Sequence, residues 1–372
     1  MVRERRIIPL FRVYMSEKVD KPLLETVHSG WIGQCGKVNE WEKILAKKLN
    51  NPRVLSLSAG THGLHLALKL AGVERKDEVI TTALTCFATT TPILAQGAEP
   101  VWADIQADSL NIDPQSIRQR ITKYTKAIIA MHWGGYPADL EEIYRIANDY
   151  DLFVIEDAAH AYGATYKDSI IGDCKYSDYC MISTQAIKTL TTGDGGILCL
   201  KSNDDYALGK LLRWYGISRE LPRTDFRCEE DIKEAGFKYN LNDIAATIGL
   251  VNIKEVDTNI ATARSNAAYY RKELADFDGV TLLQNAEDRQ SSYWLFTILV
   301  ENRTEFFRMM GEKGISVSRV HERNDKHTCV KEFRRPLPVL DSVIDKMVCI
   351  PVNWWVKKED REYIVNAIKY GW

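Results

Sequence analysis

One segment of the sequence places a lysine among hydroxyl-bearing residues and glycines. Lys188 lies in 183–196, Ser-Thr-Gln-Ala-Ile-Lys-Thr-Leu-Thr-Thr-Gly-Asp-Gly-Gly, between the apolar runs 179–182 and 197–200. A lysine held inside a fold loses its proton more easily than one on a helix surface, and the neutral amine can attack a carbonyl carbon. Lys188 is therefore a candidate Schiff-base residue. The alternative is that its side chain simply reaches solvent, as most lysines do.

Acidic residues follow another apolar run, at 152–155. Glu156 and Asp157 come directly after it, and small residues and His160 come next. A carboxylate at the end of a buried strand, beside small residues that leave room for a flat ring, can pair with a protonated ring nitrogen. A solvated acidic turn or a metal pair would use the same residues. We expect no metal site, because His160 is the one good ligand nearby and no second cluster completes a shell.

A third segment, Ser-Ala-Gly-Thr at 58–61, connects an apolar run to a helix-like stretch. Gly60 would let the backbone approach a ligand, a hydroxyl group would cap the helix, and unpaired amides at the helix start favour an anion. We expect a phosphate there. An ordinary helix cap with a tight turn is the alternative.

The elements that must position these residues alternate between about residues 53 and 200. The expected strands are 53–57, 78–82, 126–131, 152–155, 179–182 and 197–200, and the expected helices are 61–70, 88–95 and 140–150. This alternation predicts a parallel sheet covered by helices on both faces. Ligands of such sheets bind beyond the carboxyl ends of the strands, where the three segments above would lie.

The pattern changes after Asn242. The expected helices there are 242–253, 257–276, 304–312 and 358–368, and the strand-like runs are 280–283, 294–300 and 315–318. This mixture is typical of a smaller α+β domain. We divide the chain into a large domain, 1–255, and a small domain, 256–372.

Composition excludes several classes of protein. The 372 residues are 45% hydrophobic and 27% charged, which is typical of a globular chain of two or three domains. A net charge of -2 supplies no basic field for nucleic acid. No stretch has the pattern of a secretion signal or a membrane span. We therefore expect no membrane partner. The eight cysteines show no zinc-ligand spacing, so we expect free thiols in the cytoplasm.

The order of these motifs resembles the DegT-type nucleotide-sugar aminotransferases, which are fold-type I enzymes that use pyridoxal 5′-phosphate (PLP). Besides the three segments above, similar pieces lie at 29–32, 98–101, 163–166 and 242–246, so the resemblance covers nearly the whole chain. It implies an α/β fold with a mostly parallel seven-stranded sheet and a smaller C-terminal α+β domain. It also implies a homodimer with shared active sites.

The resemblance gives roles to individual residues. It implies that Lys188 forms the Schiff base with PLP, that Asp157 pairs with the ring nitrogen, and that His160 stands where the family has Gln or His beside the ring. The family usually stacks an aromatic residue on the other ring face. Here Cys86 occupies that position and Phe87 follows it, so the identity of the stacking residue stays open.

The resemblance also indicates how phosphate and substrate are held. Gly60, Thr61 and Ser183 would hold the cofactor phosphate, and Lys238, in the segment 236–240, would reach the phosphate of the partner subunit's PLP. The family's substrate loop appears here as 321–325. Its candidate substrate-binding residues are His321, Arg323, Asn324 and Asp325.

The implied reaction is transfer of an amino group from glutamate to a keto sugar linked to a nucleoside diphosphate. We favour C4 of a 4-keto-6-deoxyhexose, in a pathway such as O-antigen (lipopolysaccharide) or natural-product glycosylation. Amination at C3 or of a cyclitol stays open. A PLP-dependent sugar dehydratase is disfavoured, because those relatives carry His in place of Lys188. Lys188 and Asp157 also argue against a non-catalytic regulatory protein, and the missing glycine fingerprint argues against a nicotinamide enzyme.

Overall fold

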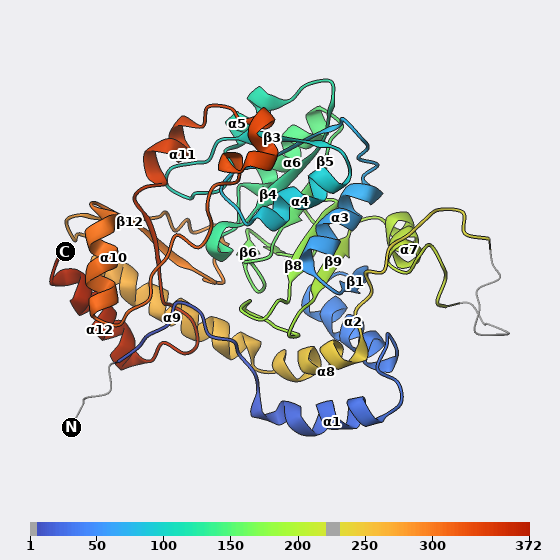
Figure 1. Ribbon diagram of the computed structural model, residues 1–372, viewed down its shortest axis with the longest axis horizontal. Helices are drawn as coiled ribbons and strands as arrows, with labels where there is room; N and C mark the ends of the chain where they lie inside the picture. Colours follow the sequence, from blue (N-terminus) through green and yellow to red (C-terminus); the bar gives the residue numbers. More distant parts are fainter. Residues whose placement is uncertain (1–5, 221–230) are drawn as a thin grey trace.

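The computed structural model describes residues 6–220 and 231–372. Its main element is a seven-stranded sheet of order β1-β9-β8-β5-β4-β2-β3 (Figure 1). The strands are β1 (Val54–Leu57), β2 (Glu78–Thr82), β3 (Glu99–Ala103), β4 (Thr125–Met131), β5 (Phe153–Asp157), β8 (Tyr179–Ser183) and β9 (Gly196–Leu200). Within this sheet, β3, β2, β4, β5 and β8 pair in parallel with their neighbours in that order. Strand β9 is antiparallel to both of its neighbours, β8 and β1. The predicted mostly parallel seven-stranded sheet is confirmed; β3 was not among the expected strands.

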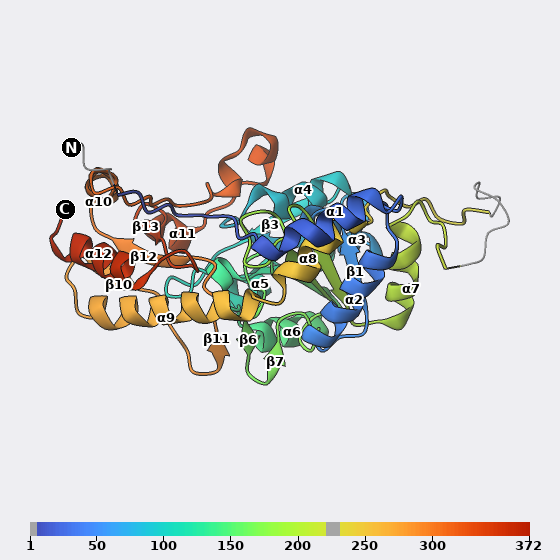
Figure 2. The ribbon, with the colours of Figure 1, turned by 90° about the horizontal axis from the view of Figure 1, so that it is seen from below.

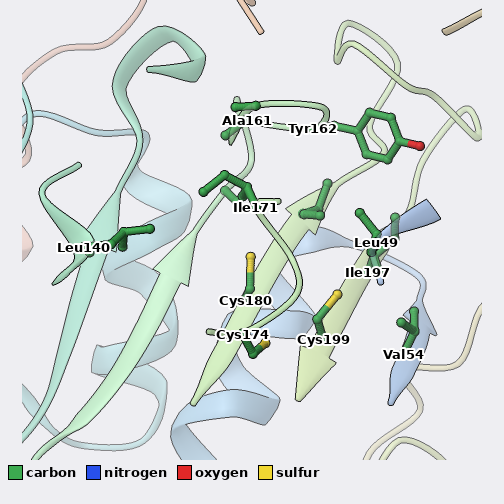
Figure 3. Close-up of a cluster of buried hydrophobic side chains, with 14 of the residues drawn as sticks. Leu49, Val54, Leu140, Ala161, Tyr162, Ile171, Cys174, Cys180, Ile197 and Cys199 are labelled. Atoms are coloured by element: carbon green, nitrogen blue, oxygen red, sulfur yellow. The ribbon is translucent and has the colours of Figure 1, made fainter. Parts of the chain in front are cut away.

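Helices cover both faces of this sheet. One face packs against α2 (Gly36–Lys48), α5 (Pro114–Arg120), α6 (Leu140–Asp149) and α8 (Asp243–Asn252), and the other against α3 (Gly60–Leu70), α4 (Phe87–Ala95) and α7 (Asn203–Leu212). The side chains of each strand alternate between the faces, so Cys180 of β8 lies on the first face and Met181 on the second. Figure 3 shows part of the first core, where Cys174, Cys180 and Cys199 lie side by side. The sheet is therefore buried on both sides.

The C-terminal part contains a second, antiparallel sheet of order β10-β12-β13. Its strands are β10 (Val280–Leu282), β12 (Phe296–Val300) and β13 (Met347–Ile350). The other strands and α-helices of the whole chain are α1 (Asp20–His28), α9 (Val256–Leu274), α10 (Arg303–Glu312), α11 (Pro338–Val343), α12 (Lys358–Lys369), β6 (Thr165–Tyr166), β7 (Ser169–Ile170) and β11 (Arg289–Gln290). Helix α9 joins the two parts, because Val256 packs in the core of the large sheet and Tyr270 in the C-terminal core. A division near residue 255 stays a prediction.

The N-terminal segment crosses from the C-terminal part to α1 (Figure 2). Ile8 is buried in the C-terminal core, and its amide donates to the Gly314 carbonyl at 2.8 Å. By packing, Ile8 thus lies with the C-terminal residues, although we grouped it with the large domain. The strand expected at 315–318 is absent: Ile315 and Ser318 form isolated bridges with Ile8 and Cys349.

The expectations about membrane spans and cysteines can be compared with the structure. Within residues 6–220 and 231–372, no helix combines the length and apolar character that a membrane span requires. The seven cysteines in these ranges are unpaired, and Cys228 lies outside the described residues.

Candidate active site

Three strands of the large sheet end at the same edge, and polar residues lie at those ends. Asp157 is the last residue of β5 and Ser183 the last of β8, while Gly60 begins α3 shortly after β1. A Cβ atom on Gly60 would lie 3.2 Å from the Ser183 Cβ and 3.0 Å from the Met181 Sδ. Because these contacts are already tight, Gly60 allows the start of α3 to approach Ser183 closely.

Lys188 lies in the loop between β8 and β9, which is closed on itself by threonines. The hydroxyl groups of Thr184 and Thr192 lie 2.8 Å apart, and the Thr192 amide donates to the Thr184 carbonyl at 3.0 Å. From the C-terminal part, the indole N–H of Trp294 donates to the Ile187 carbonyl at 2.8 Å. The loop is therefore fixed on both sides of the lysine.

The Lys188 amine contacts the ring of Trp294 and interacts electrostatically with the carboxylate of Asp157. Its Nζ lies 3.8 Å from the centre of the Trp294 ring. Burial lowers the pKa of Lys188 to about 8, although Asp157 and Cys86 act in the opposite direction. A larger fraction of the amine is therefore neutral near pH 7 than for a lysine on the surface.

Asp157 is buried and held by two donors. The Thr89 hydroxyl donates to Oδ2 at 2.6 Å, and the Ala159 amide donates to Oδ1 at 3.2 Å. Burial raises the pKa of Asp157, and these two hydrogen bonds oppose that effect, together with the charge of Lys188. The carboxylate thus has fixed partners within the protein.

Imidazole and indole rings surround the lysine. His160 stacks on Trp294 with ring centres 3.8 Å apart, and the His321 ring lies parallel to His160 at 5.7 Å. Burial, followed by the charge of Lys188, lowers the pKa of His160 well below its usual value and that of His321 to about 4. Trp133 meets both imidazoles edge-on. The two histidines are therefore neutral near pH 7.

The start of α3 differs from the cap that we expected. Ala59 is the N-cap, and no side chain of the described residues caps the helix. The Ser58 hydroxyl instead lies 2.9 Å from the His62 Nδ1, while Thr61 is partly buried. The prediction of a hydroxyl cap was therefore wrong. The uncapped amides leave the start of α3 suited to an anion such as a phosphate.

The two candidates for the ring-stacking position point to different places. Cys86 is the N-cap of α4 and is close enough to affect the Lys188 amine electrostatically. The Phe87 ring meets His327 edge-on, with centres 4.9 Å apart. Of the two, Cys86 is thus the residue with an electrostatic effect on the lysine, and the identity of the stacking residue stays a prediction.

Lys238 lies in a separate cavity. Its Nζ donates to the Asn240 Oδ1 at 2.6 Å and lies 4.2 Å from the centre of the Trp214 ring. The cavity, of about 450 Å³, is also lined by Trp31 and Arg219. Within residues 6–220 and 231–372, no hydrogen bond or ion pair joins Lys238 to Lys188 or Asp157.

Among the four substrate candidates, His321 belongs to the aromatic cluster and the other three bond to the protein. Arg323 forms two 2.7 Å hydrogen bonds to Asp325 and pairs with Asp341. The Asn324 Nδ2 donates to the Thr90 hydroxyl at 2.8 Å. These contacts hold the guanidinium and dock the loop that carries His321 on α4. The expected substrate role of Arg323, Asn324 and Asp325 stays a prediction.

Several residues around Lys188 and Asp157 were not predicted from the sequence. Trp294 was recognised as the beginning of an expected strand, and Trp133 was not singled out. Thr89 lies close to Cys86 and Phe87 in the sequence, but nothing there indicated that its hydroxyl would meet Asp157. These residues come from distant parts of the chain, so no local sequence pattern predicts that they meet at the site.

The arrangement fits PLP on three observations. The uncapped start of α3 beside Ser183 suits a phosphate. The buried Nδ1 of His160 has no hydrogen-bond partner among the described residues and is free to meet a ligand group. The pKa of Lys188, lowered by burial to about 8, suits an amine that attacks an aldehyde.

Solved structures of known enzymes resemble the whole chain. A sugar aminotransferase from Micromonospora echinospora is 41% identical, with a TM-score of 0.94 over 98% of this chain and 100% of that one. A structure from Streptococcus pneumoniae in its PLP form is 25% identical, with a TM-score of 0.90 over 98% of both chains. The predicted fold agrees with both structures, and the predicted cofactor agrees with the second.

Sequence comparison gives the same family. A UDP-4-amino-4-deoxy-L-arabinose–oxoglutarate aminotransferase from Shewanella sediminis is 33% identical over 295 residues, which cover 78% of this chain and 75% of that protein. The model of the DegT/DnrJ/EryC1/StrS aminotransferase family matches residues 14–369. The chain therefore belongs to this family, and it is a PLP-dependent sugar aminotransferase.

Proposed function

We propose that the protein transfers the amino group of glutamate to C4 of a 4-keto-6-deoxyhexose carried on a nucleoside diphosphate. The observation that carries the proposal is the Lys188 amine, whose pKa burial lowers to about 8 and which shares its surroundings with Asp157 and His160. Sugar aminotransferase activity follows from the family. The nucleotide, the position on the ring and the donor are the proposed parts.

Each residue of the cluster has a task in this reaction. PLP, when bound, supplies an electron-withdrawing ring that makes the C–H bond beside the amino group more acidic. Lys188 would hold the cofactor aldehyde and, as a free amine, would take up and return a proton at its Nζ. Asp157 would pair with the ring nitrogen as an anion, and His160 would stay neutral beside the ring. Ser183 and the amides that begin α3 would hold the phosphate.

The name of the Shewanella sediminis relative supports the C4 position and the amino donor. That protein acts on a UDP-linked sugar that carries nitrogen at C4, with oxoglutarate as the partner ketoacid. Oxoglutarate is the ketoacid of glutamate, which supports glutamate as the donor here.

We further propose a homodimer whose two copies share their sites. The exposed fraction of Trp31 is 71% and that of Leu24 is 59%, which is unusual for large apolar side chains and suits a covered surface. Trp31 also lines the Lys238 cavity with Arg219. A lysine and an arginine there suit the phosphate groups of a cofactor or a nucleotide bound to the partner.

The reaction can be tested directly. The purified protein would be incubated with glutamate labelled with ¹⁵N on its amino group and with UDP- or dTDP-linked 4-keto-6-deoxyhexose. We expect ¹⁵N on C4 of the product by NMR, and none with Lys188→Ala. Borohydride, which reduces a C=N bond, should fix a pyridoxyl group on Lys188 in the peptide map. Label at C3, or no transfer to either nucleotide sugar, would contradict the proposal.

Sharing of the sites needs a separate test. Lys188→Ala and Lys238→Ala homodimers would be unfolded together and refolded as a mixture. If each site takes Lys238 from the other copy, the mixed dimers hold one intact site, and about a quarter of wild-type activity should return. No recovery, with mixed dimers present by native mass spectrometry, would place both lysines in one chain's site.

We also propose that the protein works in the cytoplasm. The unpaired state of the seven described cysteines supports this location, because thiols persist in reducing compartments.

A further inference from the structure

Two threonine hydroxyl groups form a chain that ends on Asp157. The Thr85 and Thr89 Oγ1 atoms lie 2.7 Å apart, and the Thr89 Oγ1 lies 2.6 Å from the Asp157 Oδ2. The exposed fraction of Thr85 is 1%, that of Thr89 is 0% and that of Asp157 is 3%. Water therefore cannot replace these hydrogen bonds, and the groups must satisfy one another.

The direction of the chain follows from counting protons. An ionised carboxylate can only accept, so the single proton of the Thr89 hydroxyl points to the Asp157 Oδ2. The Thr89 oxygen must then accept from Thr85, whose hydroxyl is the donor of the 2.7 Å contact. Both dipoles are oriented toward the carboxylate, and each strengthens the other in these dry surroundings.

The backbone brings the three residues together. Thr85 precedes α4, and Thr89, four residues later, lies in its first turn. Asp157 is on the strand face covered by α3 and α4, as is Ile155 two residues before it. Because the Ala159 amide holds the other carboxylate oxygen, both oxygens have a fixed partner and the carboxyl group cannot turn freely.

We propose that Thr89, supported by Thr85, is a positioning residue that keeps Asp157 ionised and aimed at the ring nitrogen of PLP. This inference rests on the role given to Asp157 above. A neutral carboxyl group could not pair with a protonated ring nitrogen as an anion. Burial pushes Asp157 toward that neutral form by raising its pKa, and the hydrogen bond from Thr89 is the largest opposing influence.

The test compares two cofactors. Thr89→Val removes the hydroxyl with little change of shape, and binding to the apoprotein would be measured for PLP and for 1-deaza-PLP, in which carbon replaces the ring nitrogen. We expect Thr89→Val to weaken PLP binding roughly tenfold, as loss of a hydrogen bond to a charged group does, and to leave the deaza analogue unaffected. Thr89→Ser should restore PLP binding.

Controls separate this role from a structural one. Thr91→Val changes an exposed threonine of the same helix and should alter neither affinity. Thr85→Val, one hydroxyl further from Asp157, should weaken PLP binding less than Thr89→Val, and it serves as the second variant if Thr89→Val does not fold. Equal losses for PLP and the deaza analogue in either variant would overturn the inference.

The wild-type protein separates the inference from the proposal beneath it. If wild type binds PLP and the deaza analogue equally, Asp157 does not pair with the ring nitrogen and its proposed role fails. If wild type prefers PLP but Thr89→Val keeps the whole preference, the role of Asp157 stands and that of Thr89 fails.

Discussion

The Lys188 amine lies 3.8 Å from the centre of the Trp294 indole, although the two residues are far apart in the sequence. Trp294 is fixed from several sides: its ring stacks on Phe11 at 5.2 Å, and its carbonyl accepts from the Asn353 side chain at 2.9 Å. The indole thus covers the amine and contributes to the burial that lowers the pKa of Lys188 to about 8. Residues from three separate parts of the chain create the surroundings of one lysine.

Burial of Lys188 should destabilise the apoprotein at neutral pH. The pKa of Lys188 falls to about 8 in the folded protein from 10.5, so between these values the unfolded chain binds more protons and stability rises with pH. We expect Lys188→Met to raise the free energy of unfolding at pH 7 by about 1–3 kcal/mol. Urea denaturation without PLP should show this gain shrinking from about pH 8 upward.

The matched control is Lys254→Met, which changes an exposed lysine. Its difference from wild type should not vary across the same pH range. A gain for Lys188→Met that stays constant with pH would show that lost packing or charge elsewhere, rather than proton release by Lys188, causes it.

The hydroxyl of Ser183 should matter for phosphate and for no other part of the cofactor. It lies at the end of β8, next to Gly60 at the start of α3. We expect Ser183→Ala to weaken PLP binding to the apoprotein roughly tenfold, because a hydrogen bond to a charged group is lost. Pyridoxal, which lacks the phosphate, should bind both proteins equally in the same fluorescence titration. A parallel loss for pyridoxal would place the effect elsewhere in the pocket.

The two clustered histidines should not titrate in the physiological range. Burial, reinforced by Lys188, lowers the pKa of His321 to about 4 and that of His160 well below 6.5. The His321 imidazole is therefore already neutral above about pH 5.5, and the His160 imidazole is neutral near pH 7. We expect kcat/KM to show no step near pH 6.5 that His321→Asn removes. A step that disappears in this variant would mean that the loop exposes His321 in solution.

The ion pairs of Arg323 should hold the substrate loop. The exposed fractions of the Arg323 and Asp325 side chains are 7% and 9%, so Arg323→Met leaves a buried carboxylate without a partner. We expect a loss of about 3 kcal/mol in the free energy of unfolding. The KM for the keto sugar should also rise, because His321 is carried by the same loop, while PLP binding stays unchanged.

A second substitution checks the physical reason. Combining Arg323→Met with Asp325→Leu removes the unpaired carboxylate and should recover part of the lost stability. Lys331→Met, at an exposed lysine of the neighbouring segment, serves as the neutral control. If the loss of stability in the double variant equals or exceeds the sum of the two single losses, the pairing of Arg323 with Asp325 is not the cause.

The large sheet and the ends of its strands could be predicted from the amino-acid pattern. Apolar runs between helical patterns located β4, β5 and β8 to within a few residues, because strand and helix periodicities are local properties of the chain. Parallel strands bring their carboxyl ends to one edge, so Asp157, Ser183 and Lys188 could be expected there before any coordinates. The antiparallel direction of β9 was not predicted, because the twelve residues between β8 and β9 are long enough for either a hairpin or a crossover.

The tertiary structure alone decided what surrounds those residues. Trp294 over the lysine, Thr89 behind Asp157 and the enclosure of Arg323 by two carboxylates all depend on contacts between distant segments. A motif gives the type and order of side chains, whereas pKa values and hydrogen-bond partners depend on burial and distance, which only packing sets. The sequence therefore identified Lys188 and Asp157 as candidates. The fold lowers the pKa of Lys188 and supplies the hydrogen-bond donors to Asp157.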